Sequence, residues 1–307
     1  MTSIVTRIRC ESGQAIVFVV LALTVLVGMA ALVIDGGSWY QAQRKLQTAA
    51  DAAALGGAQH LPTEQTQART VALDYAQKNY AGIPAPAVDF PDVGTISVSA
   101  TAQAPGIFAR ILDIDQVTVR AEAQARVFAP SELKNVAPIA VHRDKACLNT
   151  NPACFGQPVT MTFDTLQVTN SKFGLLDLDR DGNAGAGEMK CWLEKGYSEK
   201  CGNTNYLPVG VDYPDASGEK NGIQKLLEDA ATEKRVLLFP VFDNAGATGF
   251  HVIGWSAFVI DEVVKWAGQE HVFTGHFVTF IATDVAAGNP ITDPSNDFGV
   301  HVIALTK

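Results

Sequence analysis

Oxygen-bearing side chains recur at a fixed spacing in the stretch DLDRDGNAGAGE, which covers residues 177–188. Aspartates occupy positions 1, 3 and 5 of this stretch, a glycine occupies position 6, and a glutamate occupies position 12. Calcium takes several hard oxygen ligands from a loop that can curl around the ion. The sequence therefore predicts a Ca²⁺ loop with these ligands: Asp177, Asp179, Asp181, the backbone carbonyl of Asn183, and Glu188 as the closing bidentate carboxylate.

The segments that flank this loop must position it. The preceding KFGLLDL resembles a strand and not the amphipathic helix that leads into a paired EF-hand, and Ala184 stands where such loops carry a large aliphatic residue. A paired calcium sensor is therefore excluded. A lone structural loop in an exported domain would bind weakly, with a Kd on the order of 10⁻⁴ to 10⁻³ M, and would still fill outside the cell. The alternative is an acidic Asp-Gly turn that binds no metal.

Motifs for catalysis are scarce. The sequence has no G-x-S-x-G elbow, no Walker loop and no G-x-G-x-x-G after a strand. Neither H-x-H nor H-E-x-x-H spacing connects five of the histidines, His142, His251, His271, His276 and His301. The net charge is −9 and basic clusters are missing, which argues against nucleic acid as a partner. We expect a non-enzymatic protein without a small-molecule substrate.

The cysteines fit an exported domain. Cys10 lies near the N-terminus as a free or lipidated thiol. The other four cysteines lie between residues 147 and 201. An even number in an exported domain indicates disulfides. Four cysteines can pair in three ways. We predict the pairing in which both disulfides close short loops, Cys147–Cys154 and Cys191–Cys201. A zinc site is the rival interpretation, but it lacks a C-x2-C pair.

Residues Ala15 to Ile34 form a nearly unbroken apolar run, AIVFVVLALTVLVGMAALVI. Twenty residues at about 1.5 Å each match a hydrocarbon core of about 30 Å, so we predict one transmembrane helix. Arg7 and Arg9 precede it, which favours a cytoplasmic tail at 1–14 and export of the bulk of the chain. The alternative is a cleaved signal peptide with a processing site near Gly28-Met29-Ala30.

The helix is predicted to continue beyond the membrane as a stem over residues 35–60. This segment is rich in strong helix formers and contains no proline before Pro62. A helix from residue 14 to residue 60 would be about 70 Å long. Its outer part carries Ala and Gly, which allow another helix to approach closely. Those small residues could pack in an assembly of helices or on the stem's own domain, and the sequence leaves both open.

Beyond the stem, the sequence predicts an α+β fold in two parts. A small α+β unit is expected at 61–130, with a helix at 64–80, a linker or turn region at 81–91 and strands at 95–103 and 117–128. A β-rich extracytoplasmic domain is expected at 131–307, with its clearest helix at 223–234. We expect its core to contain Trp255, Phe258, Phe277, Phe280 and Ile281.

The N-terminal segment opens with Glu11-x-Gly13-Gln14, leaves its apolar run at Ile34-Asp35-x-Gly37 and continues into AADAAAL at residues 49–55. With this pattern it resembles the TadE/TadG-like proteins of Flp pilus assembly, the bacterial tight-adherence (Tad) system. The resemblance extends to about residue 130, where FARILDIDQVTVRAEAQARV is similar to a strand passage of the family. It departs from the family in lacking a clear prepilin-peptidase site and a D-x-S-x-S metal signature. The matching residues are Glu11, Gly13, Gln14, Ile34, Asp35, Gly37, Tyr40, Leu46, Gln47 and the run 49–55.

This resemblance implies a non-enzymatic component of Flp pilus assembly. It would be a single-pass protein of the bacterial cell membrane with an extracytoplasmic bulk. Its partners would be other Tad/Flp pilus-assembly or pilin-like membrane proteins, contacted by helix packing and by the exported domain. The alternative function is a stand-alone membrane-tethered binding module, unconnected to a pilus, in which the calcium loop is structural.

Overall fold

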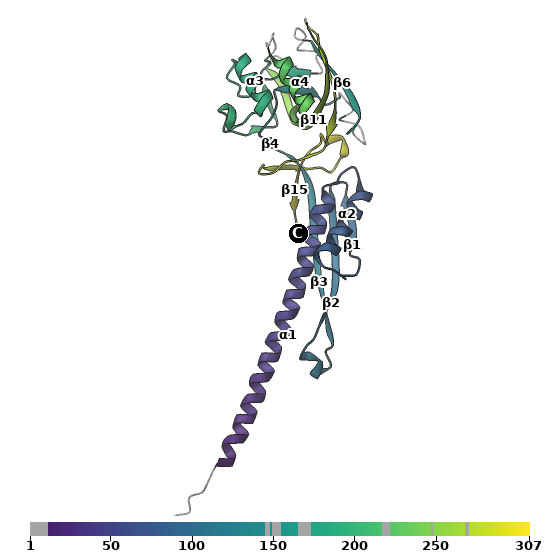
Figure 1. Cartoon of the computed structure of the whole chain (residues 1–307), viewed down its shortest axis with the longest axis vertical. Helices are drawn as coiled ribbons and strands as arrows, with labels where there is room; N and C mark the ends of the chain where they lie inside the picture. The colour runs from purple at the N-terminus through teal and green to yellow at the C-terminus, as the bar shows by residue number, and fades with distance from the viewer. Residues whose placement is uncertain are drawn as a thin grey trace, which may run out of the picture.

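The computed structural model describes residues 12–144, 148, 155–164, 173–216, 222–246, 248–267 and 270–307. Most of the predicted cytoplasmic tail, with Arg7, Arg9 and Cys10, lies outside these residues. Figure 1 shows an elongated molecule with one long helix at its base, a small sheet beside the upper part of that helix, and a larger β-rich part beyond. The predicted α+β class with an N-terminal apolar helix is confirmed.

Helix α1 (Ser12–Ala58) is the longest element, at 47 residues or about 70 Å. It contains the one stretch among the described residues that is long and apolar enough to cross a membrane. Nearly every side chain from residue 15 to residue 34 is exposed, whereas all the alanines of the last three turns except the half-buried Ala52 are buried. We call residues 15–34 the bare half of α1, because their side chains are exposed, and residues 46–58 its packed half.

The packed half of α1 lies against α2 (Gln65–Asn79) and against a sheet of order β1-β2-β3-β15-β13. We call residues 46–58 of α1, α2 and this sheet the collar. Alanine allows the two helices to approach closely, and the small residues of the stem meet small residues of α2. The stem thus packs on its own domain, which answers the question that the sequence left open. The buried residues of this contact are Leu46, Ala50, Ala53, Ala54, Ala58, Ala68, Ala72 and Ala76.

The buried face of α2 differs from the predicted one. The three- and four-residue spacing of the sequence places Val71, Tyr75 and Ala76 on one face of this helix. Ala76 is buried as this spacing predicts, but Val71 is only half-buried and Tyr75 is 41% exposed. The reason is the short distance between α1 and α2, which only alanine side chains can fill at the centre of the contact. A Cβ added to Gly56 would lie 3.1 Å from the ring of Tyr75, so this ring covers the helix crossing from outside.

The collar sheet is built on a long hairpin that has β1 (Ala87–Asp92) at its edge. Strands β2 (Thr95–Pro105) and β3 (Gln116–Pro130) pair antiparallel from Thr95 opposite Arg126 to Pro105 opposite Gln116. Their tip contains the short 3₁₀ helix η1 (Ala109–Leu112). In Figure 1 the hairpin extends alongside α1 toward its apolar half.

The larger sheet, of order β6-β12-β11-β10-β5-β7, forms the distal domain together with helices α3 and α4. Its strands are mostly antiparallel, but β5 and β10 are parallel. Strand β9 pairs with β11 outside this order. The element bounds are β5 (Ile139–His142), β6 (Pro158–Asp164), β7 (Phe173–Leu175), α3 (Ala186–Lys195), β9 (Val211–Tyr213), α4 (Ile223–Glu233), β10 (Val236–Gly246), β11 (Gly249–Ala267) and β12 (Glu270–Val278).

The core of the distal domain is aromatic. Trp255, Phe258 and Phe277 are buried as predicted, and the Phe258 ring centroid lies 4.9 Å from that of Phe277. The prediction was wrong for Phe280, which is half-buried, and for Ile281, which is 40% exposed. Both lie on β13 (Phe280–Ile281), which has left the distal sheet and pairs with β15 (Val300–Leu305).

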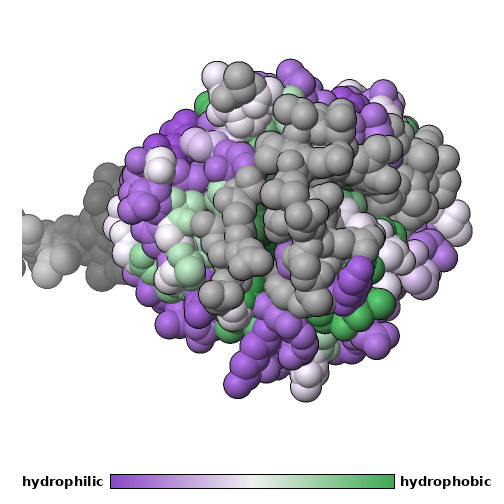
Figure 2. All heavy atoms as spheres, turned by 90° about the horizontal axis from the view of Figure 1, so that it is seen from above, coloured by the Kyte–Doolittle hydropathy of each residue, from purple (hydrophilic) through white to green (hydrophobic). Residues whose placement is uncertain are grey.

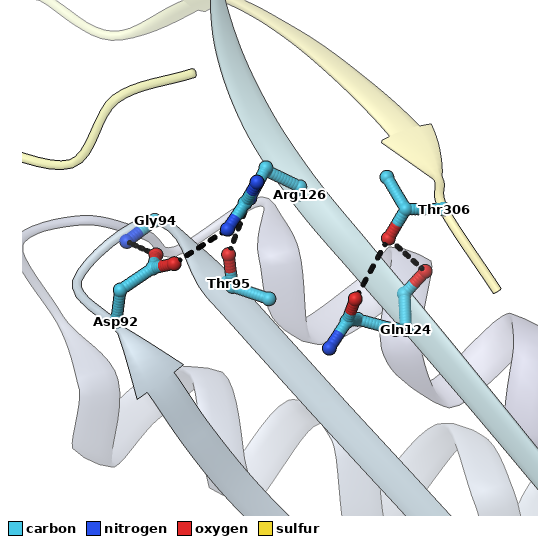
Figure 3. Close-up of polar contacts among 6 residues, drawn as sticks. All are labelled: Asp92, Gly94, Thr95, Gln124, Arg126 and Thr306. Carbon is cyan, nitrogen blue, oxygen red and sulfur yellow. Dashed lines mark hydrogen bonds and ion pairs between the residues drawn. The ribbon is translucent and has the colours of Figure 1, made fainter.

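The end of the chain returns to the collar. Strand β15 pairs antiparallel with β3, and the Thr306 hydroxyl donates hydrogen bonds to the backbone carbonyl and the side-chain Oε1 of Gln124 (Figure 3). A division of the chain at residue 131 therefore does not separate the two sheets, because β15, near the end of the predicted β-rich domain, is a strand of the collar sheet. Strand β14 (Ala287–Pro290) also pairs with β3, and β4 (Glu132–Leu133) pairs with β8 (Leu207–Pro208). The remaining short elements are η2 (Glu199–Cys201), which contacts α3, and η3 (Pro294–Asn296).

An ion pair lies two residues further along β3 from Gln124. Arg126 of β3 donates to Asp92 Oδ2 at 2.7 Å and to the Thr95 hydroxyl at 2.7 Å, while Gly94 N–H donates to Asp92 Oδ1 (Figure 3). Burial raises the pKa of Asp92, but the hydrogen bonds from Thr95, Arg126 and Gly94 outweigh it and leave the pKa below its usual value. This cluster fixes the turn between β1 and β2 against β3.

Candidate functional site

The acidic loop that the sequence singles out lies in the distal domain between β7 and α3. Leu176 forms a bridge to Asp215, and the backbone N–H of Asp177 donates to Pro214 O at 2.9 Å. The start of the loop is therefore held by a sheet-like contact, in agreement with the strand expected from KFGLLDL. Arg180 and Gly182 then take positive φ angles of 60° and 81°, which turn the chain back on itself.

This turn brings three of the predicted ligands together. One carboxylate oxygen from each of Asp177, Asp179 and Asp181 lies within 4.8 Å of the others. Backbone N–H groups hold the carboxylates in place: Gly182 N–H donates to Asp177 Oδ2 at 2.9 Å, and Asn183 N–H donates to Asp181 Oδ1 at 2.7 Å. The arrangement offers hard oxygen atoms converging on one point, which is what calcium requires.

Asp177 is the buried member of this cluster. Only 1% of its surface is exposed, and its Oδ1 atom is buried without a hydrogen-bond donor among the described residues. An unpaired buried carboxylate oxygen costs free energy, which a cation or a donor would offset. The other two carboxylates are half-buried and exposed, respectively. The cluster is therefore open to solvent at Asp181, while the buried Oδ1 atom of Asp177 has no hydrogen-bond donor among the described residues.

Asp179 shows how strongly the negative charges of this loop repel one another. Burial, the contact with the Asp177 carboxylate and the charge of Asp181 raise the pKa of Asp179 to about 6. A raised carboxyl pKa means that the ionised form is disfavoured in the folded chain. A cation in the loop or a proton on Asp179 would relieve this repulsion.

Of the last two predicted ligands, Glu188 has another contact, whereas Asn183, whose predicted ligand atom is its backbone carbonyl, lies two residues beyond Asp181. Glu188 accepts a hydrogen bond from Gly185 N–H at 2.9 Å and caps the first turn of α3. It is therefore not one of the three clustered carboxylates, and it would have to leave this cap to reach a metal. Asn183 is exposed and donates its N–H to Asp181. The capping role of Glu188 has a sequence signal, because it falls three residues after Gly185.

One of the two predicted disulfides lies beside this loop. Cys191 of α3 is bonded to Cys201 of η2, as predicted. The indole N–H of Trp192 donates to Asn203 Oδ1 at 2.9 Å, so the same segment is also tied by a hydrogen bond. Cys147 and Cys154 lie outside the described residues. The bonded pair fixes α3, whose N-terminus ends the acidic loop.

The sequence analysis missed a second site, where α1 meets the tip of the β2–β3 hairpin. Asp35 is 3% exposed, and its carboxylate accepts hydrogen bonds from the backbone N–H groups of Ile107, Phe108 and Ala109. The bond from Ile107 is 2.9 Å long. The indole N–H of Trp39 adds a bond to Pro105 O at 3.1 Å. An acidic residue directly after an apolar run was the signal, but its partners lie more than 70 residues away.

The histidines have structural contacts in the regions described. His301 lies 2.6 Å from Asp297 in a fully buried pair, and Gly299 N–H donates to the same carboxylate. This pair holds the turn that leads into β15. His251 and His276 pair with Asp212 and Asp261 at about a third exposed surface. In these contacts, His301, His251 and His276 stabilise turns and strands.

One family model matches the chain, and it matches where the long helix lies. The model of putative Flp pilus-assembly TadE/G-like proteins covers residues 13–60. The N-terminal helix is a TadE/G-like segment. No curated protein and no solved structure matches the chain.

The TadE/G-like segment coincides with α1 and the turn after it. It includes Asp35, which binds the hairpin tip, and the alanine run that packs on α2. Residues 61–307, with the rest of the collar and the distal domain, lie outside the match. The similarity to the family is therefore confined to the apolar helix and its packed end.

Proposed function

We propose that this chain is a non-enzymatic, membrane-anchored component of Flp/Tad-type pilus assembly. One observation carries the proposal: the TadE/G-like helix is bare over residues 15–34 and fused to a folded collar over residues 46–58. The bare half is free to cross the membrane and to contact other pilus-assembly or pilin-like membrane proteins. The collar and the distal domain then stand at a fixed place above it.

The decisive experiment is removal of the gene from its host bacterium. Flp pili are expected to be lost and to return when the full chain is supplied. A chain with Val20→Arg and Leu26→Arg, which place two charges in the bare helix, should not restore them. The variant with Lys225→Arg on the exposed surface of α4 is the matched control and should restore them. Normal pili in the deletion strain would contradict the proposal and favour the stand-alone binding module.

The proposed orientation places residues 1–14 in the cytoplasm and the folded bulk outside. Cys10 precedes the bare helix, and Lys225 lies on the exposed side of the distal domain. In intact spheroplasts, a membrane-impermeant maleimide should label a Lys225→Cys variant but leave Cys10 unlabelled until the membrane is opened. The reverse pattern would overturn this orientation. Labelling of neither position without lysis would place both on the inside.

We also propose that the acidic loop holds a structural Ca²⁺ ion through Asp177, Asp179 and Asp181. The unpaired, buried Oδ1 of Asp177 supports this proposal, because a cation would supply the missing partner. The loop leads directly into α3, which the Cys191–Cys201 disulfide fixes, so the ion would stabilise one edge of the distal domain. In the alternative module, this edge would belong to the binding face.

Calcium is expected to raise the melting temperature of the distal domain. With a Kd on the order of 10⁻⁴ M, millimolar Ca²⁺ adds about 1.4 kcal/mol to the free energy of unfolding. For a domain of this size, that is a rise of roughly 3 °C over the same protein in EDTA. The measurement is differential scanning calorimetry of the full chain in detergent.

Two variants make this measurement specific to the loop. Asp177→Asn keeps the acceptor for Gly182 N–H and gives the buried position a donor of its own, so the shift with calcium should disappear. Asp229→Asn removes the same charge from an exposed position on α4 and should keep the full shift. If the wild-type chain melts at one temperature in EDTA and in millimolar Ca²⁺, the loop is an acidic turn only.

A further inference from the structure

The tip of the β2–β3 hairpin carries a cluster of exposed apolar side chains. Ile111 and Leu112 are 83% and 75% exposed, the two largest exposed fractions among the apolar residues beyond α1. Soluble surfaces rarely gather such residues in one place. At the opposite end of the molecule, Figure 2 shows hydrophilic residues around most of the described rim. The full cluster at the tip is Ile107, Phe108, Ile111, Leu112 and Ile114.

The position of this tip is fixed relative to the bare helix. Asp35 binds the backbone of Ile107, Phe108 and Ala109, and it follows directly on the apolar run 15–34. The tip thus lies at the level where α1 leaves the apolar segment. In Figure 1 it is the part of the folded chain that extends furthest along α1 toward the apolar half. The exposed apolar surface of the tip therefore adjoins that of the helix.

Many backbone N–H groups of the tip already have hydrogen-bond acceptors within the protein. Hydrocarbon offers no partners to peptide groups, so exposed loops cannot enter it unless their polar groups are already bonded. Asp35 satisfies the first three N–H groups of the tip, and internal bonds satisfy Ile111, Asp113 and Ile114. Gly106 N–H closes the base of the tip by donating to Asp115 O at 2.8 Å.

The charges of the tip limit how deep it can go. Arg110 is exposed among the apolar side chains and suits lipid phosphates, while Asp113 and Asp115 lie at the return to β3. Side chains of this mixture bury a few ångströms into the boundary between headgroups and acyl chains. The cluster is thus matched to a bilayer interface and not to the interior of the membrane.

We propose that residues 107–114 insert into the bilayer interface beside α1, as a second contact that fixes the rotation and tilt of the membrane helix. This inference rests on the proposed membrane anchor. The occupant of the apolar surface is lipid, because the surface continues that of the membrane-spanning segment. With two contacts instead of one, the collar and distal domain hold a defined orientation above the membrane.

Fluorescence quenching by lipids tests this insertion. The full chain with Cys10→Ser and Leu112→Cys is labelled with an environment-sensitive fluorophore and reconstituted in vesicles of phosphatidylcholine and phosphatidylglycerol. Lipids that carry a doxyl group near the headgroup should quench the label at least about twofold, and aqueous iodide should not. The matched control carries the label at Lys225→Cys on α4, where iodide should quench and the lipids should not.

Two further labels make the outcomes distinct. A label at Val25→Cys in the bare helix should be quenched by lipids with a deep doxyl group. If position 25 is quenched and position 112 is open to iodide, the inference fails and the anchor stands; if neither is quenched by lipid, the anchor itself fails. Shielding of position 112 from both quenchers would mean a second protein surface and would overturn the lipid contact. With Ile111→Ser and Leu112→Ser, a label at Ile114→Cys should lose its lipid quenching.

Discussion

Replacing Gly57 with leucine is expected to unfold the collar at temperatures where the wild-type chain keeps it folded. A Cβ at this position would lie 2.5 Å from Ile96 Cδ1, 2.9 Å from the backbone oxygen of Ala68 and 3.1 Å from Ala72 Cβ. The Ala68 oxygen belongs to helix α2 and cannot move aside as a side-chain end can. Overpacking of this kind costs about 3 kcal/mol, which lowers the melting temperature of a unit of this size by roughly 10 °C.

Gly37 provides the matched control for this substitution. It lies in the same helix, and no atom lies within 4 Å of a Cβ added there. Gly37→Leu should therefore leave the melting temperature unchanged or raise it slightly, since leucine favours helix more than glycine does by roughly 0.8 kcal/mol. Circular dichroism of the full chains in detergent would compare the two. Equal melting temperatures for the two variants would show that α1 and α2 are not closely packed.

Replacing Asp35 with alanine is expected to release the hairpin tip from α1 while the rest of the collar stays folded. Three backbone N–H groups lose their acceptor at once, and the Trp39–Pro105 bond remains as the contact at the base of the hairpin. Hydrogen exchange at Ile107, Phe108 and Ala109 should become at least about tenfold faster. Asp35→Asn should fall between the two, because its amide keeps one acceptor oxygen.

Asp113→Asn is the control for the loss of charge. Asp113 is exposed in the same tip and has a φ of 66°, which asparagine also adopts readily. Exchange at the three amide groups should not change in this variant. Unchanged exchange in Asp35→Ala as well would show that the carboxylate does not hold the tip.

The elements that could be predicted are those with a local signal. The apolar run 15–34 and the helix beyond it follow from composition, and the helix predicted at 223–234 from Leu226 and Leu227 agrees with α4 to within one residue at its end. The edge strand β1 was missed. Residues 81–91 were assigned to a linker or turn region because they are rich in Pro, Gly and Ala. Strand β1 pairs with β2 alone, and an edge strand tolerates a proline such as Pro91.

The candidate sites show the same limit. The spacing of Asp177, Asp179 and Asp181 was visible in the sequence, and the structure brings these three together. The burial of Asp177 was not visible, because it depends on contacts with the segment around Pro214. The partners of Asp35 come from the other end of a hairpin, and no periodicity connects them. In both sites, contacts between residues far apart in the sequence determine the surroundings of the key aspartate.

The return of β15 to the collar determines how force would pass through the molecule. β3 leaves the collar for the distal domain at Pro130, and β15 begins its return at Val300, with Val302 opposite Phe128 on the neighbouring strand. A pull on the distal domain would therefore load both strands along their axes and in the same direction. Because β3 and β15 are pulled together, the load passes to the hydrogen bonds between β3 and β2, which resist together, in shear, instead of opening one after another. A protein anchored in this way can transmit tension to its membrane helix without unzipping.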